Sequence, residues 1–399
     1  MIPDGWTLYS FGDIVVKSQY GLSIPSSLDG QYYIFKMNNF KDGKMNPRKV
    51  DKVNLSDADL EKFMLNHGDI LINRTNSIDL VGKTGVFDLE GVFTFASYLV
   101  RFQVNRTIAN PFFVNFFFNW SESQQRLKEI ATLGVSQANI NPTALQKYFK
   151  ILLPPLLEQC RIAEVLGVWD ESIDLLERLI GKTRSRKQGL MQQLLTGKKR
   201  FKEFESSEWR TIKLSDFFTE ISKKNTNNED LIVLSCSKVY GIVPQSSIFA
   251  KRIASEDTKR YKIVEANNLV YDPMLLWDAS IGFVESVNRG VISPAYNTFK
   301  YKGSYDVLPY FRYLFKSYEF KEIYKVISQG TNVRRRKAPA KTFLSIEFEF
   351  PQSVPEQEKI AAVLSAADEE ISTLEKQLAA YKQQKLGLMQ QLLTGRIRI

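Results

Sequence analysis

The sequence predicts an α+β fold: two mixed α/β domains separated by two long antiparallel coiled-coil helices, all related by a pseudo-twofold axis. The first observation is an internal repeat, because residues 158–197 recur at 356–395 without a gap and with 21 identities in 40 positions. The second is that the repeat has a heptad pattern, whereas the segments between its copies have short strand-like runs. A repeat of half the chain makes a pseudo-dimer within one polypeptide, which suits a target with two halves.

Each copy of the repeat is predicted to form one long helix. Apolar residues recur at alternating steps of four and three, which indicates a coiled-coil seam roughly 48 Å long at ~1.5 Å per residue. Prolines precede both copies, and Gly197 and Gly395 close them, as helix start and stop signals do. The seam residues singled out are Ile162, Leu166, Trp169, Ile173, Leu176, Ile371, Leu374, Leu378, Leu388 and Leu392.

The two helices are expected to run in opposite directions. Each begins at its own domain, so two pseudo-twofold copies that share a seam must pair antiparallel. A lysine occupies the same seam position in both copies, Lys187 and Lys385. Two interpretations stay open. Either the lysine stems lie along the surface at a diverged position, or a polar seam position fixes the register.

The helices divide the chain into four segments. The first domain is predicted at 1–153 and its spacer helix at 154–198. The second domain is predicted at 199–350 and its spacer helix at 351–399. The two domains share a frame, because each opens with a tryptophan followed seven residues later by an aspartate. Their interiors differ in sequence, so two modules of one design are expected to read two different targets.

Each domain also has an aromatic helix candidate that starts at a proline, followed by a polar loop that starts at a glycine. The helix candidates are 111–130 and 309–327, and the loops are 134–141 and 330–337. Strand-like runs broken by turns precede them in both domains. Each domain is therefore predicted to be mixed α/β.

Composition points to an anionic partner and away from a membrane. Lys and Arg number 54 against 44 Asp and Glu, which gives a net charge of +10 and favours nucleic acid as the partner. No apolar run reaches about 18 residues, and the first six residues do not resemble a signal peptide. Two cysteines fit a reduced compartment, so we expect a cytoplasmic protein.

The motifs that would indicate catalysis fail one by one. Gly82-Lys83-Thr84 lacks the glycine that a phosphate-binding loop needs five residues earlier, so it is read as a turn. Asp42-Gly43 is read as a hairpin turn rather than part of a nuclease site. His67 is the only histidine, which removes most zinc sites and most histidine catalysis. The chain is therefore predicted to be non-catalytic, with no metal site.

Basic and polar loops are the remaining candidates for function. Asn, Gln and Arg side chains there have the hydrogen-bonding geometry that reads base edges, and runs of Lys and Arg suit DNA phosphates. The alternatives are a solvated loop or local bonding to the backbone. The predicted DNA-contacting residues are Arg74, Asn76, Ser77, Lys83, Gln137, Asn139, Lys251, Arg252, Lys259, Arg260, Arg334, Arg335, Arg336 and Lys337.

With these residues and motifs in view, the chain resembles the specificity subunit of type I restriction–modification systems. The resemblance covers essentially the whole chain, and the order of its motifs, duplicated at half-chain spacing, is what makes it specific. The second domain departs from the family pattern at 267–271 and 330–337, which puts in doubt which residues there read bases. The carriers are Gly5-Trp6, segments 68–87 and 134–141, the helix entries at 153–159 and 354–357, and the two QQLLTG repeats.

The resemblance implies two target recognition domains that each read one half of a bipartite, asymmetric site in double-stranded DNA. Two methyltransferase (modification) subunits would carry S-adenosylmethionine and methylate adenine. Restriction subunits would join for cleavage and carry ATP and Mg. The chain itself would bind no cofactor. The alternative is a non-catalytic nucleic-acid-binding or coiled-coil scaffold protein of another system.

Overall fold

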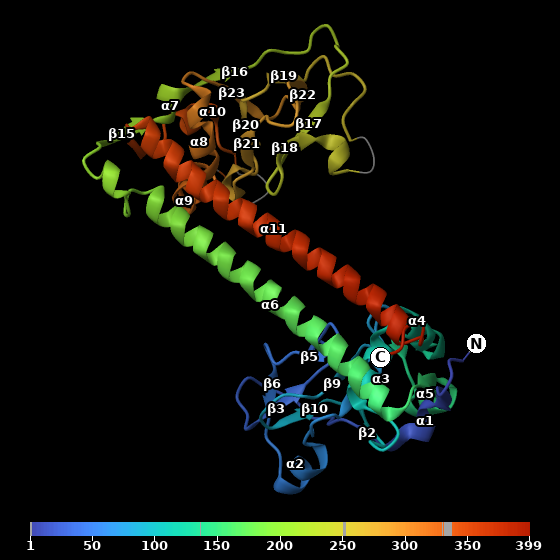
Figure 1. Cartoon of the computed structure of the whole chain (residues 1–399). Helices are drawn as coiled ribbons and strands as arrows, with labels where there is room; N and C mark the ends of the chain where they lie inside the picture. Colours follow the sequence, from blue (N-terminus) through green and yellow to red (C-terminus); the bar gives the residue numbers. More distant parts are fainter. Residues whose placement is uncertain (1, 136, 250–252, 329, 331–336) are drawn as a thin grey trace. The chain divides into compact units, whose positions relative to one another are not determined.

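The computed structural model describes residues 2–135, 137–249, 253–328, 330 and 337–399 (Figure 1). The chain forms two compact units. Unit 1 contains residues 1–177 and 376–399, and unit 2 contains residues 178–375. Each unit therefore holds one domain, the first part of the long helix that follows it, and the last part of the other long helix.

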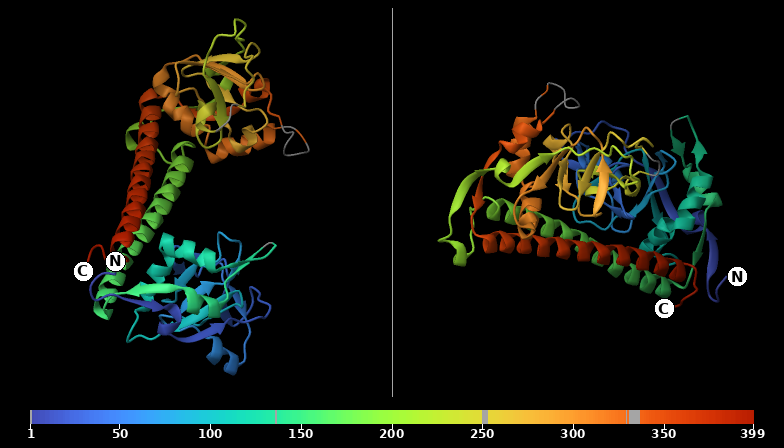
Figure 2. Two further views of the ribbon diagram at one scale, coloured as in Figure 1. Left: turned by 90° about the vertical axis from the view of Figure 1, so that its right-hand side faces the viewer. Right: turned by 90° about the horizontal axis from the view of Figure 1, so that it is seen from above.

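The long helices are α6 (Leu156–Leu194) and α11 (Val354–Leu392), and each has 39 residues. In unit 1 they run antiparallel, because Asp170 of α6 meets Lys385 of α11 while Glu177, further along α6, meets Lys382 (Figures 1 and 2). In unit 2 they are antiparallel as well, because Arg184 pairs with Glu375 and Lys187 pairs with Asp368.

The predicted seam residues mostly face inward. Side chains from both helices are buried in the unit cores, and others are half-buried along the pair. Both helices end before a glycine in the left-handed region, Gly197 and Gly395, each at φ +68°. Such a backbone conformation disfavours any residue with a Cβ, so these glycines stop the helices where the sequence predicted. The buried seam residues are Ile162, Leu166, Ile173 and Leu392, and the half-buried ones are Trp169, Leu176, Ile371, Leu374, Leu378 and Leu388.

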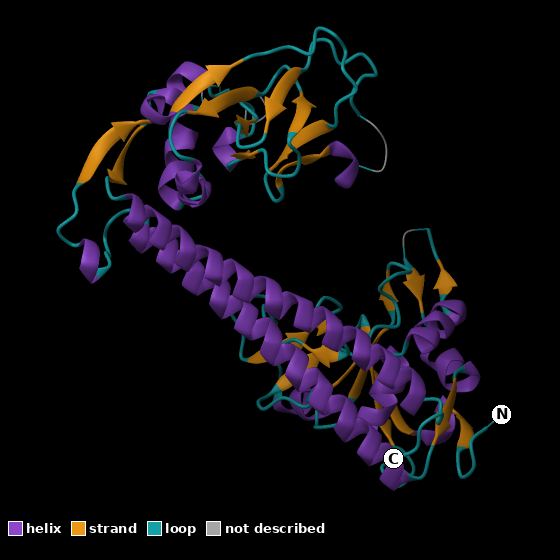
Figure 3. Cartoon of the chain, turned by 45° about the horizontal axis from the view of Figure 1, so that its top comes forward, coloured by secondary structure: helices purple, strands orange, loops and turns teal. Residues whose placement is uncertain are grey.

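The domain of unit 1 is built on a six-stranded sheet of order β2-β11-β7-β9-β5-β4, with smaller sheets β10-β3-β6, β12-β13-β8 and β1-β14. Figure 3 shows its strands in orange and its helices in purple. Its strands are β1 (Thr7–Ser10), β2 (Val15–Tyr20), β3 (Tyr32–Phe35), β4 (Phe40–Lys41), β5 (Lys44–Met45), β6 (Asp51–Val53), β7 (Ile70–Asn73), β8 (Thr75–Asn76), β9 (Thr84–Val86), β10 (Phe93–Phe95), β11 (Leu99–Val104), β12 (Thr132–Leu133), β13 (Ala138–Asn139) and β14 (Lys150–Leu153). Its helices are α1 (Phe11–Ile14), α2 (Asp57–Phe63), α3 (Pro111–Asn119), α4 (Ser121–Ile130) and α5 (Pro142–Tyr148).

The domain of unit 2 repeats this plan with a four-stranded sheet β16-β23-β20-β21 and a second sheet β18-β17-β22-β19. The first and last strands of the domain, β15 and β24, form a separate two-stranded sheet, as β1 and β14 do in unit 1. The strands are β15 (Trp209–Lys213), β16 (Phe218–Ile221), β17 (Val233–Ser237), β18 (Gly241–Pro244), β19 (Lys262–Glu265), β20 (Leu269–Tyr271), β21 (Ile281–Phe283), β22 (Arg289–Ile292), β23 (Asn297–Tyr301) and β24 (Glu347–Pro351). The helices are α7 (Leu214–Phe217), α8 (Leu308–Leu314), α9 (Tyr318–Ile327) and α10 (Ala340–Leu344).

The single helix predicted at 111–130 is two helices, α3 and α4, and the one predicted at 309–327 is also two, α8 and α9. Trp120 separates α3 from α4 in an extended conformation, with φ −66° and ψ 140°. Ser317 separates α8 from α9 and caps α9, because its side chain accepts a hydrogen bond from the amide of Phe320. An extended residue in the first domain and a side-chain cap in the second therefore divide the aromatic helix that the sequence predicted.

The core of each domain continues onto the helix pair. In unit 1 the aromatic core packs with Leu166 of α6 and with Leu392 of α11. In unit 2 the equivalent core packs with Leu194 of α6 and Leu364 of α11. Each domain is therefore seated on the start of one long helix and the end of the other by buried apolar surface.

Both units are closed by the same arrangement of an arginine, a glutamate and a tryptophan. In each, the arginine that follows the end of one long helix makes a bidentate ion pair with the glutamate in the first turn of the other, and its guanidinium lies 5.8 Å from the centre of a tryptophan ring. We call each of these groups a closing trio. The closing trio of unit 1 is Arg398, Glu158 and Trp6, and that of unit 2 is Arg200, Glu356 and Trp209. Within the described residues, no helix is long and apolar enough to cross a membrane.

Candidate nucleic-acid interface

Two polar segments that the sequence singled out separately meet in unit 1. Strand β13 pairs antiparallel with β8, with Ala138 opposite Asn76 and Asn139 opposite Thr75. The amide of Ile140 also donates to the carbonyl of Arg74 at 2.8 Å. Residues some 60 positions apart in the chain therefore form one small sheet, completed by β12.

Arg74 is the best-positioned cation of this sheet. Its guanidinium carbon lies 4.9 Å from the centre of the Tyr20 ring, and its Nη2 donates to Asn139 Oδ1 at 3.2 Å. Its backbone amide donates to the carbonyl of Tyr98 at 3.0 Å. A guanidinium stacked on a ring and bonded at one edge has little rotational freedom, so it presents its remaining donors in a defined direction.

Such an arginine can contact nucleic acid in two ways. Its planar donors fit the O6 and N7 acceptors of guanine or two oxygens of a phosphate. The Nε of Arg74 is buried and has no partner among the described residues. Tyr20 and Tyr98, which were not predicted, are each about half exposed, at 50% and 46%. Sequence reasoning missed them because a tyrosine at a strand end has no signal that separates a ring platform from a core residue.

Among the other predicted DNA contacts of unit 1, some bond to the neighbouring backbone and others have exposed side chains. The Oδ1 of Asn76 accepts from the amide of Ser77 at 2.8 Å, so that atom makes the local bond that the sequence left as an alternative. The carbonyl of Ser77 accepts from two amides of the following turn. Lys83 is half-buried just before β9, and the side chain of Gln137 is exposed while its carbonyl closes the β12–β13 hairpin.

The β12–β13 hairpin also carries two exposed apolar residues that sequence reasoning missed. The exposed fraction of Leu133 is 70%, and Val135 is fully exposed. Exposed apolar side chains are able to contact the methyl group of thymine in the major groove. Alternation of polar and apolar residues in 132–139 is the signal that would have pointed to them.

In unit 2 the predicted contacts are only partly described. Lys259 and Arg260 are exposed in the turn before β19, where the amide of Lys259 donates to Asp257 Oδ1 at 3.0 Å. Lys337 is exposed next to Ala338, whose carbonyl accepts from the hydroxyl of the buried Tyr271 at 3.0 Å. Five further predicted contacts lie outside the described residues: Lys251, Arg252, Arg334, Arg335 and Arg336.

Comparison with known proteins shows the family to which this duplicated chain belongs. The sequence model of the family described as the type I restriction modification DNA specificity domain matches twice, at residues 3–182 and 206–381. The chain belongs to this family. Its members recognise DNA sequence within type I restriction–modification systems, and its specificity subunits are generally non-catalytic. The predicted resemblance is confirmed.

Individual relatives agree with the family. The chain is 26% identical to the putative type I restriction enzyme MjaX specificity subunit of Methanocaldococcus jannaschii, over 100% of this chain and 95% of that one. It is 27% identical to the type I restriction enzyme StySPI specificity subunit of Salmonella potsdam, over 52% of this chain and 44% of that one.

Two solved structures share the fold of the specificity subunit. The crystal structure of a type I restriction–modification S subunit from M. genitalium matches with a TM-score of 0.60 at 15% identity, over 97% of this chain and 96% of that one. A chain from a structural study of complex assembly in the type I system matches with a TM-score of 0.58 at 15% identity, over the full length of both. The predicted fold class, two mixed α/β domains with two long helices, is thereby confirmed.

Proposed function

We propose that this specificity subunit recognises a split, asymmetric DNA site, with one target recognition domain reading each half. It directs adenine methylation by two methyltransferase subunits, which carry S-adenosylmethionine, and cleavage by restriction subunits, which use ATP and Mg. The observation that carries the proposal is that the two halves of the chain agree where each domain meets the long helices and differ in their sheets and loops. Each domain meets the long helices at an equivalent trio of arginine, glutamate and tryptophan. The sheets of the two domains, in contrast, differ in strand number and in their loops.

The β8–β13 sheet supports the assignment of the first half-site to unit 1. It gathers Arg74, Asn139 and the exposed Gln137 in one place, and these are the residue types that read guanine and adenine edges in the major groove. The net charge of +10 adds the unspecific attraction to phosphates that precedes readout.

Methylation mapping tests this proposal. The chain would be co-expressed with its methyltransferase partner, and methylated adenines would be located by sequencing. We expect two short half-sites with an unread gap. Replacing residues 1–153 by another recognition domain is expected to change one half-site and leave the other unchanged. A contiguous site, or a swap that alters both halves, would overturn the proposal.

A pure scaffold function, in which the helix pair is the product and the domains bind protein, predicts a different result. The assembled complex would then show no preference among duplexes in a gel shift. The chain alone is expected to transfer no methyl group from S-adenosylmethionine to DNA, and measurable transfer by the purified chain would contradict its non-catalytic role.

A further inference from the structure

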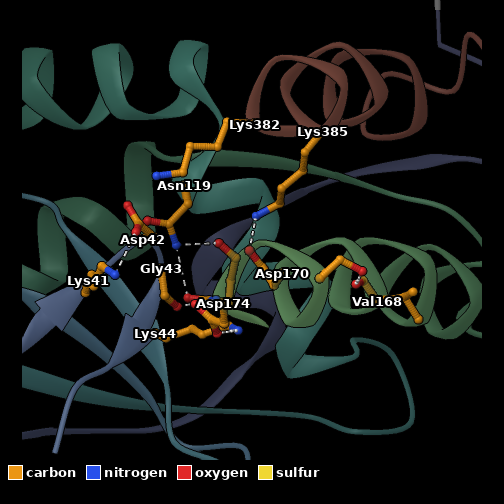
Figure 4. A network of polar contacts seen from close by, with 12 residues as sticks. Lys41, Asp42, Gly43, Lys44, Asn119, Val168, Asp170, Asp174, Lys382 and Lys385 are labelled. Atoms are coloured by element: carbon orange, nitrogen blue, oxygen red, sulfur yellow. Dashed lines mark hydrogen bonds and ion pairs between the residues drawn. The ribbon is translucent and has the colours of Figure 1, made fainter. Parts of the chain in front are cut away.

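The lysine on the helix seam joins three elements in unit 1. Lys385 of α11 reaches Asp170 of α6, with Nζ 2.5 Å from Oδ1 (Figure 4). The same ammonium lies 5.2 Å from the centre of the Phe116 ring on α3, an element of the recognition domain. The lysine and aspartate side chains are only 13% and 9% exposed. We call this group of three residues the seam joint.

Unit 2 contains the same joint, built independently. Lys187 of α6 pairs with Asp368 of α11 at 2.6 Å, and its ammonium lies 5.1 Å from the centre of the Tyr313 ring on α8. The hydroxyl of Tyr313 donates to the second carboxylate oxygen of Asp368 at 2.9 Å. Lys187 and Asp368 occupy the repeat positions equivalent to Lys385 and Asp170, 198 residues apart. Each recognition domain therefore places an aromatic ring on the lysine of the helix pair.

The joint is a costly way to hold two helices together. Burial raises the pKa of Asp170, and the charge of Lys385 opposes that shift. A hydrophobic pair of similar volume often gives equal or greater stability than a buried ion pair. The best-attested use of a polar group on a coiled-coil seam is to select one register. Roughly half of the repeat positions differ between the copies, yet both copies keep this lysine and this aspartate.

The register argument is specific for these positions. A slip of one heptad, ~10.5 Å along the helix, would bring Leu378 or Leu392 opposite Asp170 in unit 1. In unit 2 it would bring Ile180 or Leu194 opposite Asp368. In unit 1 the slip would leave a buried carboxylate against an apolar side chain, which is strongly unfavourable, whereas the cost is smaller in unit 2 because Asp368 is 47% exposed.

Further contacts tie the first recognition domain to the joint. Asp42 and Gly43, at φ 50° and 79°, form the tight turn between β4 and β5. From this hairpin Lys44 pairs with Asp174 at 2.7 Å (Figure 4). Lys41 pairs with Glu177. Glu177 also accepts from Lys382 of α11 at 2.7 Å. Three acidic residues of α6, Asp170, Asp174 and Glu177, therefore form ion pairs with lysines of the β4–β5 hairpin and of α11.

We propose that each seam joint fixes its recognition domain at one position on the helix pair, so that Lys385 and Lys187 are positioning residues that set the unread gap of the DNA site. The proposal rests on the split-site function. Without the joint, the buried apolar core and the Arg398–Glu158 ion pair still hold the domain on the helices, but a slip of one helix against the other no longer separates a buried charge pair. Gap length then loses its single value while each half-site keeps its sequence.

The first test removes both charges of one joint, so that no orphan charge remains. The variant Lys385→Met with Asp170→Leu, assembled with the methyltransferase, would be assayed on duplexes whose gap is correct, or shorter or longer by about three base pairs, which is the length of one heptad. We expect the preference for the correct gap to fall about tenfold, with a melting temperature equal to or above that of the unmodified protein. Discrimination against a mismatch in either half-site is expected to persist.

Three controls separate positioning from general damage. Lys385→Arg keeps a cation that can pair and stack, so it is expected to retain the gap preference. Glu375→Gln removes an exposed ion pair between the two helices, and it is expected to leave the gap preference unchanged. Lys187→Met with Asp368→Leu makes the same change at the joint of unit 2, and serves if the first apolar pair fails to assemble. We expect it to broaden the gap as well.

The outcomes are distinguishable. An unchanged gap profile in the charge-free variants would overturn the joint as a positioning device. A loss of half-site discrimination would also overturn it, because the residues would then act on base reading. A contiguous site in the unmodified complex would instead refute the split-site function itself.

Discussion

At the scale of single residues, the contacts of Arg74 allow base reading to be tested against unspecific charge attraction. The guanidinium is stacked on Tyr20 and bonded to Asn139, so part of the entropy of holding it in place is already lost before DNA arrives. Arg106, an exposed arginine of the same domain whose Nη2 donates to the carbonyl of His67, carries equal charge without this support.

We therefore predict that Arg74→Ala weakens recognition of one base pair in the half-site read by unit 1, by about 1–3 kcal/mol. Tyr20→Leu removes the ring platform and is expected to cost about 0.5–1 kcal/mol at the same base pair. The measurement is methylation rate on single-mismatch duplexes. Arg106→Ala is the matched control, and it is expected to change affinity without changing discrimination. Equal loss for all sequences in Arg74→Ala would make this residue a phosphate contact.

The arginine run of the second domain is predicted to contact the DNA backbone. Three adjacent guanidiniums cannot all reach base edges in one groove. Replacing Arg334, Arg335 and Arg336 together by alanine is expected to lower affinity for every sequence and to flatten the plot of log affinity against log salt by roughly 0.9 for each phosphate that is no longer neutralised. Binding would be measured across salt concentrations on cognate and mismatched duplexes. Reduced discrimination at one base pair with an unchanged slope would identify direct readers instead.

At the scale of elements, the acids of α6 couple the β4–β5 hairpin to α11. Hydrogen bonds from Lys382 and then from Lys41 lower the pKa of Glu177 below its usual value of 4.5. A carboxyl whose pKa is lower in the folded state adds stability above its unfolded pKa and loses that contribution as the pH falls through the folded pKa. The helix pair should therefore weaken under acid conditions.

We predict that Glu177→Gln lowers the melting temperature of the protein at pH 7 and has a smaller effect below pH 4. The glutamine cannot supply the charge that both lysines favour, so it removes the contribution that ionisation provides near neutrality. Thermal unfolding of both proteins across this pH range measures the difference. A constant difference at all pH values would mean that packing, and not the charge of Glu177, carries the effect.

A second prediction at this scale concerns helix length. Each unit has its own joint, so α6 and α11 must change together. One heptad inserted in each helix, between residues 177 and 184 and between residues 375 and 382, keeps all four charges in register. The insertion adds ~10.5 Å, about three base pairs at ~3.4 Å each. Methylation mapping should find a gap longer by about three base pairs between unchanged half-sites. An insertion in α6 alone is expected to disrupt assembly.

At the scale of the whole molecule, the chain forms two units that repeat one plan. Each takes its domain and the start of one helix from one half of the sequence, and the end of the other helix from the other half. Unit 1 is therefore assembled from two separate segments, whereas unit 2 is the one continuous segment 178–375. The domains differ where loops and sheets face outward, and they agree at the closing trios and the seam joints.

The sequence by itself determined the architecture, because heptad spacing, proline starts and glycine stops are local signals that hold along each helix. It also identified polar loops as candidates for DNA contact. It predicted one aromatic helix per domain where there are two, since neither the cap at Ser317 nor the extended backbone at Trp120 was recognised in the sequence.

Only the tertiary structure decided which distant residues meet. Tyr20 lies 54 positions from the Arg74 that it supports, and Asn139 lies 65 positions beyond, so no local pattern could join them. The seam lysines show the same limit. Sequence left them as either surface residues or register markers, and their role depends on an aspartate and an aromatic ring brought from other elements. Periodicity is a property of one segment, whereas a joint exists only after separate segments have packed.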